Sequence, residues 1–151
     1  MQTPVTAVAQ AIAQELIELV HEAIDRTSSG RDAHTDNRLK AAIEARVQTD
    51  GSSPTVHILY DDYLAYIDAG RKPQSGKQPP IETLREWAMA RNIPADNSTL
   101  FLISRAIHRE GIEPRPILSI LDQEIEKRLQ GDWQERILDA VMQRLNEVME
   151  H

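Results

Sequence analysis

The sequence predicts an α+β fold, in which a small antiparallel β-sheet packs with a long N-terminal helix, a central helix pair and C-terminal helices. Three features of the pattern lead to this prediction. Apolar residues recur at helical spacing over residues 5–24. Residues 42–60 alternate apolar and polar side chains, as the strands of a half-exposed hairpin do. Helical spacing then returns from residue 80 to the end of the chain.

We expect residues 1–151 to form a single domain, because this length is that of one ordinary domain and suffices to bury a core. Within it we expect a core over about residues 1–120 and a C-terminal helical extension over about residues 117–151. The hydrophobic fraction of 40% and the charged fraction of 27% are typical of folded chains.

The N-terminal helix is expected over residues 5–24. Thr3 is a suitable N-cap, and Pro4 suits the first helical position because it has no N–H to leave unpaired. The apolar arc of this helix is wider than one small hairpin could cover. We therefore expect part of the arc, at Leu16 and Leu19, to contact a neighbouring subunit.

The hairpin over residues 42–60 is expected to need cover from other elements. Ile43, Ala45 and Val47 alternate with polar residues and predict the first strand, residues 50–54 (DGSSP) form the turn, and TVHILY supplies the second strand. An isolated hairpin is only marginally stable in water, so helices must cover its apolar face or further strands must extend it. The polar segment at residues 27–37, which precedes it, is expected to be a loop.

The centre of the chain is expected to carry three helices and an exposed loop. A short helix ends at Gly70, and residues 71–79 are a basic, proline-rich loop without apolar side chains. Helices at residues 80–92 and 98–110 form the central pair, and from residue 117 onward the pattern is helical again.

Charge is distributed unevenly along the chain, whose net charge is −7. Residues 1–69 have five Lys and Arg against eleven Asp and Glu, residues 70–115 have eight against five, and residues 116–151 have four against eight. A basic centre therefore lies between two acidic ends. Two interpretations remain open: the charges cover solvated faces, or they serve self-assembly between unlike surfaces.

Composition and motifs give little indication of catalysis. The absence of cysteine excludes disulfides, thiol nucleophiles and thiolate zinc sites. The five histidines lack metal-ligand spacing, and the glycines form neither a P-loop nor a dinucleotide fingerprint. No apolar run approaches the roughly 20 residues that cross a bilayer. We expect no enzymatic activity, no cofactor, no metal and no membrane partner.

The middle of the chain runs through YLAYIDAGRKP, a glycine and PP, IETLREWA, and LFLISRAIHREGIEPRPIL. In this order and spacing it resembles the tail-completion proteins (head–tail joining or neck proteins) of tailed bacteriophages over about residues 35–120. The chain departs from the family pattern in having Asn37 in place of Gly, Ala42 in place of Ser and Ile117 in place of Phe. The matching positions are Tyr66, Asp68, Gly70, Arg71, Pro79, Pro80, Trp87, Ile103, Arg105, Ile107, Gly111, Pro114, Arg115, Pro116, Ile117 and Leu118.

The resemblance implies an α+β fold and a structural role in the virion, with no cofactor and no enzymatic step. It implies a homo-oligomeric ring, hexameric or dodecameric, located at the head–tail junction after synthesis in the host bacterial cytoplasm. The partners expected from it are further copies of the chain, the connector or neck proteins, the tail tube proteins, and genomic DNA that passes through the ring without specific recognition.

Partner contacts are also expected at charged residues. The 71–79 loop is expected to dock on an acidic partner through Arg71, Lys72 and Lys77. Arg71 and Arg115 lie beside turn residues, so they either pair with carboxylates, within the fold or on a neighbour, or point into solvent. Acidic side chains are expected to line the DNA channel, because Lys and Arg would hold the phosphates. Candidates near loop ends are Asp25, Asp32, Asp36 and Asp50.

Two other functions compete with the structural one. The chain could be a small DNA-binding regulatory protein that uses the helix pair around residues 80–110. It could also be a small hydrolase with carboxylates gathered around residues 61–68, where Asp61, Asp62 and Asp68 lie.

Overall fold

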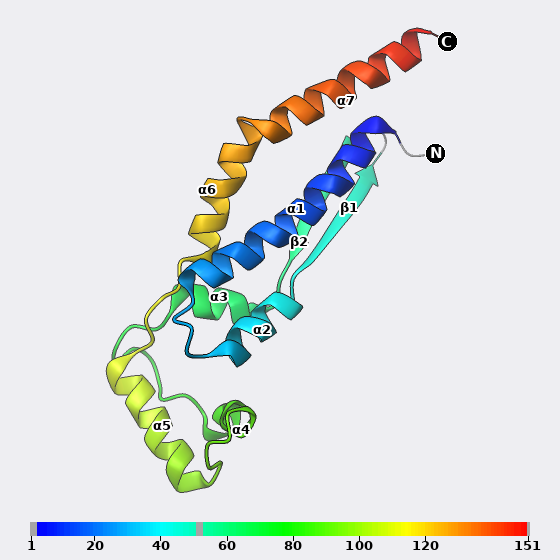
Figure 1. Cartoon of the computed structure of the whole chain (residues 1–151). Helices are drawn as coiled ribbons and strands as arrows, with labels where there is room; N and C mark the ends of the chain where they lie inside the picture. Colours follow the sequence, from blue (N-terminus) through cyan, green and yellow to red (C-terminus); the bar gives the residue numbers. More distant parts are fainter. Residues whose placement is uncertain (1–2, 51–52, 151) are drawn as a thin grey trace.

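The computed structural model describes residues 3–50 and 53–150 and confirms the α+β class. Most elements form one long body, and α4 and α5 form a smaller lobe at one end of it (Figure 1). In chain order the elements are α1 (Pro4–Thr27), α2 (Ala33–Ala41), β1 (Glu44–Asp50), β2 (Ser53–Leu59), α3 (Asp62–Ala69), α4 (Ile81–Ala90), α5 (Asn97–Glu110), α6 (Ile117–Leu129) and α7 (Asp132–Met149).

Helix α1 is the central element of the body. The Thr3 hydroxyl caps it by accepting a hydrogen bond from the backbone N–H of Thr6 at 3.2 Å, and Pro4 occupies its first turn. The hairpin, α2, α6 and α7 all pack against it. Its apolar arc is wide because several elements cover it from different sides.

Leu16 and Leu19 therefore lie in the core of the body, and their expected contact with a neighbouring subunit is wrong. They are 6% and 3% exposed and belong to the same cluster as Leu64 of α3 and Trp133 of α7. The C-terminal helices α6 and α7 return along α1 and cover the part of its apolar arc that the hairpin leaves open.

The hairpin is present as predicted, with an antiparallel register that pairs Val47 with Val56 and Glu44 with Leu59. Val56 and Ile58 are half-buried and pack against the core of the body, while the alternate residues Thr55, His57 and Leu59 are exposed. Helix α1 lies against both strands and covers this face. The centre of the predicted turn, residues 51–52, lies outside the described residues.

Helix α2 corrects the expected loop at residues 27–37, because the helix begins at Ala33. The Asp32 carboxylate is its N-cap and accepts hydrogen bonds from the backbone N–H of Thr35 at 3.2 Å and from the Thr35 hydroxyl at 2.7 Å. Leu39 of this helix is fully buried against α1. One capping residue and one apolar anchor are enough to fix a helix whose sequence is otherwise polar.

The C-terminal helices contribute to the body's core. Ile117 and Leu121 of α6 and Trp133 of α7 are buried with the residues of α1. The lobe has a cluster of its own, centred on Leu84, Ala88 and Leu100. The described part of the chain thus has two apolar clusters. No helix among residues 3–50 and 53–150 combines the length and apolar character needed to cross a membrane.

We expect Leu19→Ala to lower the free energy of unfolding by about 3 kcal/mol, because it leaves a cavity beneath α1 that the surrounding side chains cannot fill. Glu18→Ala, at an exposed neighbouring position, is the matched control and should change stability by less than about 0.5 kcal/mol. Equilibrium urea unfolding followed by circular dichroism measures both. Equal stability of the two variants would contradict the burial of Leu19.

Candidate functional site: the neck between body and lobe

Two linkers connect the body to the lobe, at residues 70–80 and 111–116, and we call this pair the neck. They run side by side, because Arg71 and Ile112 exchange two backbone hydrogen bonds of 2.8 Å each. The backbone N–H of Gln74 also donates to the carbonyl of His108 at 2.6 Å. The chain thus leaves and re-enters the body through one antiparallel bridge.

Two glycines make this close approach possible. Gly70 and Gly111 have φ of +67° and +76° with ψ near 180°, a region that residues with a Cβ rarely adopt. A Cβ on Gly70 would lie 2.6 Å from the carbonyl oxygen of Ile112, and a Cβ on Gly111 would lie 2.4 Å from that of Arg71. Neither position can accept a side chain while the bridge is intact.

Arg71 organises the 71–79 loop and pairs with no carboxylate among the residues that the structure describes. Its guanidinium donates to the carbonyl of Ser75 at 2.9 Å and to the carbonyl of Lys77. The loop is held by these contacts, while the side chains of Lys72 and Lys77 remain exposed. Of the three basic residues expected to dock on a partner, these two lysines have their charges in solvent.

Arg115 does pair with a carboxylate, within the fold. Its guanidinium lies 2.9 Å from the Asp36 carboxylate and donates to the carbonyl of Ile24 at 2.7 Å and to the Thr27 hydroxyl at 3.2 Å. Both charged side chains are largely buried. A cation at the C-terminal end of α1 also complements the helix dipole. Arg115 thereby fixes the neck to α1 and α2.

Several of the residues that carry the resemblance meet at the neck. The Asp68 carboxylate accepts a hydrogen bond from the backbone N–H of Leu118 at 2.8 Å, at the start of α6. The backbone N–H of Arg115 donates to the carbonyl of Ile67 at 3.2 Å. Two distant stretches of sequence contribute these residues, one with Asp68 and Gly70 and the other with Gly111 and Arg115. Their contacts hold the two stretches together, so these residues have a structural role in this chain.

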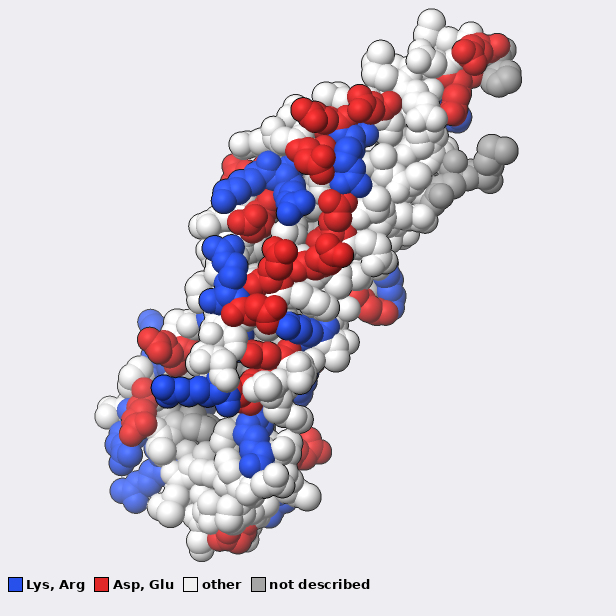
Figure 2. All heavy atoms as spheres, viewed as in Figure 1, with Lys and Arg blue, Asp and Glu red and all other residues white. Residues whose placement is uncertain are grey.

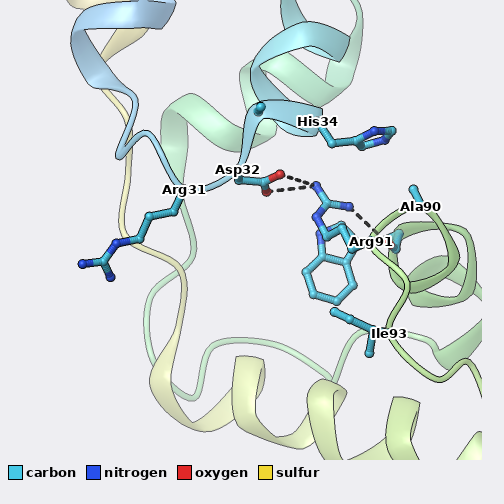
Figure 3. A pocket seen from close by; sticks show the side chains of 8 residues that line it. Arg31, Asp32, His34, Ala90, Arg91 and Ile93 are labelled. Atoms are coloured by element: carbon cyan, nitrogen blue, oxygen red, sulfur yellow. Dashed lines mark hydrogen bonds and ion pairs between the residues drawn. The ribbon is translucent and has the colours of Figure 1, made fainter.

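A second contact joins the lobe to the body, and we call it the clasp. The Arg91 guanidinium, at the end of α4, lies 2.9 Å from the Asp32 carboxylate and over the Trp87 ring, 4.6 Å from its centroid (Figure 3). An open pocket of about 480 Å³ lies beside it, and Arg31 points away from the ion pair. No signal in the sequence links Asp32 to Arg91, because they are 59 residues apart and belong to unrelated motifs.

The pKa of Asp32 reflects the clasp. Burial alone would raise the pKa of this carboxyl group, but hydrogen bonds from Thr35 and Arg91 and the charge of Arg91 outweigh that effect. The pKa therefore lies below its ordinary value, and the carboxylate stays ionised at neutral pH.

The acidic residues expected to line a DNA channel mostly have partners within the chain. Asp32 and Asp36 bind Arg91 and Arg115, and Asp25 lies 2.6 Å from the Lys40 ammonium. These three carboxylates therefore contribute less to a negative channel than we expected. The side chain of Asp50 lies outside the described part of the structure.

The carboxylates of the hydrolase alternative serve the fold. The Asp61 side chain caps α3 by accepting from the backbone N–H of Leu64 at 3.3 Å, and Asp68 is bound to the start of α6. Within the described ranges, 3–50 and 53–150, no group of three or more His, Asp or Glu side chains is placed to hold a metal ion.

Helix α5, the reading helix of the DNA-binding alternative, presents a mixed face to solvent. Phe101 and Leu102 are exposed on it beside Arg105 and Arg109, and Arg109 is 3.1 Å from the Glu110 carboxylate. Base edges are read mainly by polar side chains that reach into a groove. Two exposed apolar side chains at this position favour contact with a protein over the reading of DNA bases.

Helix α7 carries the longest exposed apolar face. Trp133 and Ala140 are buried against the body, and beyond Ala140 the residues of α7 are exposed except for the half-buried Glu147, with the apolar ones along one side of the helix. We call this apolar side the α7 face, and its last turns reach beyond the N-terminal end of α1 (Figure 1). Its residues are Leu138, Val141, Met142, Leu145, Val148 and Met149.

No protein-family model, no curated protein and no solved structure matched the chain. The resemblance to tail-completion proteins therefore stays a prediction, and function must be inferred from the chain's own residues and surfaces.

The neck glycines provide the first test of this site. We expect Gly111→Ala to destabilise the protein by more than about 3 kcal/mol, because the new Cβ both strains the backbone and breaks the bridge to Arg71. Gly30→Ala is the control, since Gly30 has φ of +75° with no atom within 4 Å of a new Cβ, and it should cost only about 1 kcal/mol. Thermal unfolding and amide exchange at Arg71 measure the difference, and equal losses would contradict the close approach.

The clasp predicts a dependence of stability on pH. Because the folded-state pKa of Asp32 lies below that of the unfolded chain, near 3.9, its contribution is complete above that value and is lost as pH falls toward the lower pKa. Asp32→Asn keeps an N-cap side chain but removes the charge. We expect the wild-type protein to be more stable than this variant at pH 7 and their difference to shrink as pH falls below about 4. A difference that is constant across this range would exclude the clasp.

Proposed function

We propose that the chain is a structural virion protein of a tailed phage, a ring-forming tail-completion or neck subunit that joins the head connector to the tail. The observation that carries this proposal is the α7 face. Monomeric proteins seldom expose a long contiguous apolar surface, and such surfaces mark sites of protein contact. Here six large apolar side chains share one side of α7, a helix held to the body by Trp133 and Ala140.

The neck and the clasp support a mechanical role. The bridge between Arg71 and Ile112, the Arg115–Asp36 pair and the Arg91–Asp32 pair connect the body and the lobe at separate points. A subunit of a head–tail joint must transmit docking forces between its neighbours, and several independent contacts between its parts resist bending. The protein would act stoichiometrically, through assembly alone.

Charge also fits a place around DNA and beside other virion proteins. The net charge of −7 disfavours a tight grip on phosphates, which would hinder a passing duplex. Lys72 and Lys77 project from a loop held by Arg71 and offer a basic site for an acidic connector or tail protein.

Deleting the gene from the phage or prophage that encodes it tests this function. We expect filled heads and free tails that fail to join, and joined particles when the wild-type chain is supplied in trans. Immunogold labelling of a tagged chain should mark the head–tail junction in electron micrographs. Normal infectious particles in the absence of the chain would contradict the proposal, as would a label confined to the infected cell.

A further inference from the structure

One edge of the α7 face is acidic, whereas the other edge carries Arg144, which pairs with Glu147 at 3.6 Å. At 3.6 residues per turn, Glu135, Asp139 and Glu150 follow one edge of the apolar stripe, and all three are exposed. The apolar stripe runs from Leu138 to Met149, and its acidic edge runs from Glu135 to Glu150. A partner for this face needs apolar side chains with basic groups beside them.

The lobe carries a surface of this kind, which we call the α5 face. Phe101 and Leu102 are 48% and 64% exposed, and the exposed Arg105 and Arg109 lie between them on the same side of α5. On the side shown in Figure 2, basic and acidic side chains are intermixed on the lobe, and acidic side chains lie near the free end of α7. The α5 face thus combines apolar side chains with Arg105 and with Arg109, which also lies 3.1 Å from Glu110, and these charges are opposite to those of the acidic edge of α7.

The two faces also have comparable lengths. The α5 face runs from Phe101 to Arg109, which corresponds to about 13 Å at a rise of 1.5 Å per residue. The exposed stripe of α7 from Leu138 to Met149 is about 18 Å long by the same rise. The α5 face can therefore lie within the length of the α7 face.

The two faces lie at opposite ends of the elongated molecule, so they cannot meet within one chain (Figure 1). A contact between two α7 faces is less favourable, because antiparallel packing would bring their acidic edges, with Glu135 and Asp139, against each other. The charge distribution favours a contact between unlike faces of two copies.

We infer that the α7 face of one subunit packs on the α5 face of a second copy of this chain, with Arg105 and Arg109 beside the acidic edge of α7. This inference depends on the proposed function and names the contact that builds the ring. A contact between two different faces is heterologous and repeats from copy to copy, closing into a ring when its rotation permits.

Two variants separate this contact from other arrangements. Leu102→Asp breaks only the α5 face, and Leu145→Asp breaks only the α7 face, since each side chain is at least half exposed and contributes little to folding. Leu129→Asp is the matched control, because Leu129 is 49% exposed but lies on α6, outside both faces. Circular dichroism and thermal unfolding should show that all three variants fold like the wild type.

Native mass spectrometry and sedimentation of the full chain measure assembly. We expect the wild type and Leu129→Asp to form the same closed oligomer, and Leu102→Asp and Leu145→Asp each to sediment as a monomer. Mixed at equal concentrations, these two variants should form a dimer of one copy of each and no larger species, because each supplies the face that the other lacks.

Several results would overturn the inference. If Leu102→Asp alone still assembles, through α7 pairs or another surface, the contact is wrong while a ring subunit remains possible. If the mixture stays monomeric, the two faces do not bind each other. A monomeric wild type would also overturn the contact, and the gene-deletion phenotype would then decide separately whether the chain joins heads to tails.

Discussion

The body of the molecule depends on the burial of the apolar arc of α1. Eight residues of this helix are buried, and a two-stranded ribbon alone could not cover them. The hairpin takes one side, and α2, α6 and α7 take the others, so elements from both ends of the sequence share one core. In return α1 gives the hairpin the apolar cover that it lacks alone. The position of α7, and with it the direction of its exposed face, follows from this shared core.

The lobe does not belong to that core, and its orientation depends on polar and backbone contacts. Gly70 and Gly111 let two linkers approach to hydrogen-bonding distance, and Arg115 ties them to the end of α1. Arg91 adds a contact from α4 to Asp32. Each of these contacts has a strict geometry, because hydrogen bonds and charged pairs depend on the direction of donor and acceptor. The connection between body and lobe is therefore specific even though it is thin.

Local patterns were enough to predict much of the fold, and tertiary pairing was not. Helical and alternating periodicity located α1, the hairpin and the helix pair because these signals lie within one window of sequence. The burial of Leu19 was missed because it depends on helices more than a hundred residues away. The start of α2 was missed although Asp32 is a capping residue, since polar neighbours hid the signal. A carboxylate for Arg115 was one of the alternatives, but its identity as Asp36, like the pairing of Arg91, needed the structure.

The neck links the fold to the proposed ring. In a ring with one repeating contact, the relative orientation of the two contacting faces carried by a single chain sets the rotation between neighbours. Here those faces lie on α5 in the lobe and α7 in the body, so the neck and the clasp set that angle. A flexible neck would allow a range of angles and favour open chains of mixed length. A rigid neck selects a single number of subunits per ring. Residues such as Gly111 and Arg115 would then determine the size of the assembly without touching a neighbouring subunit.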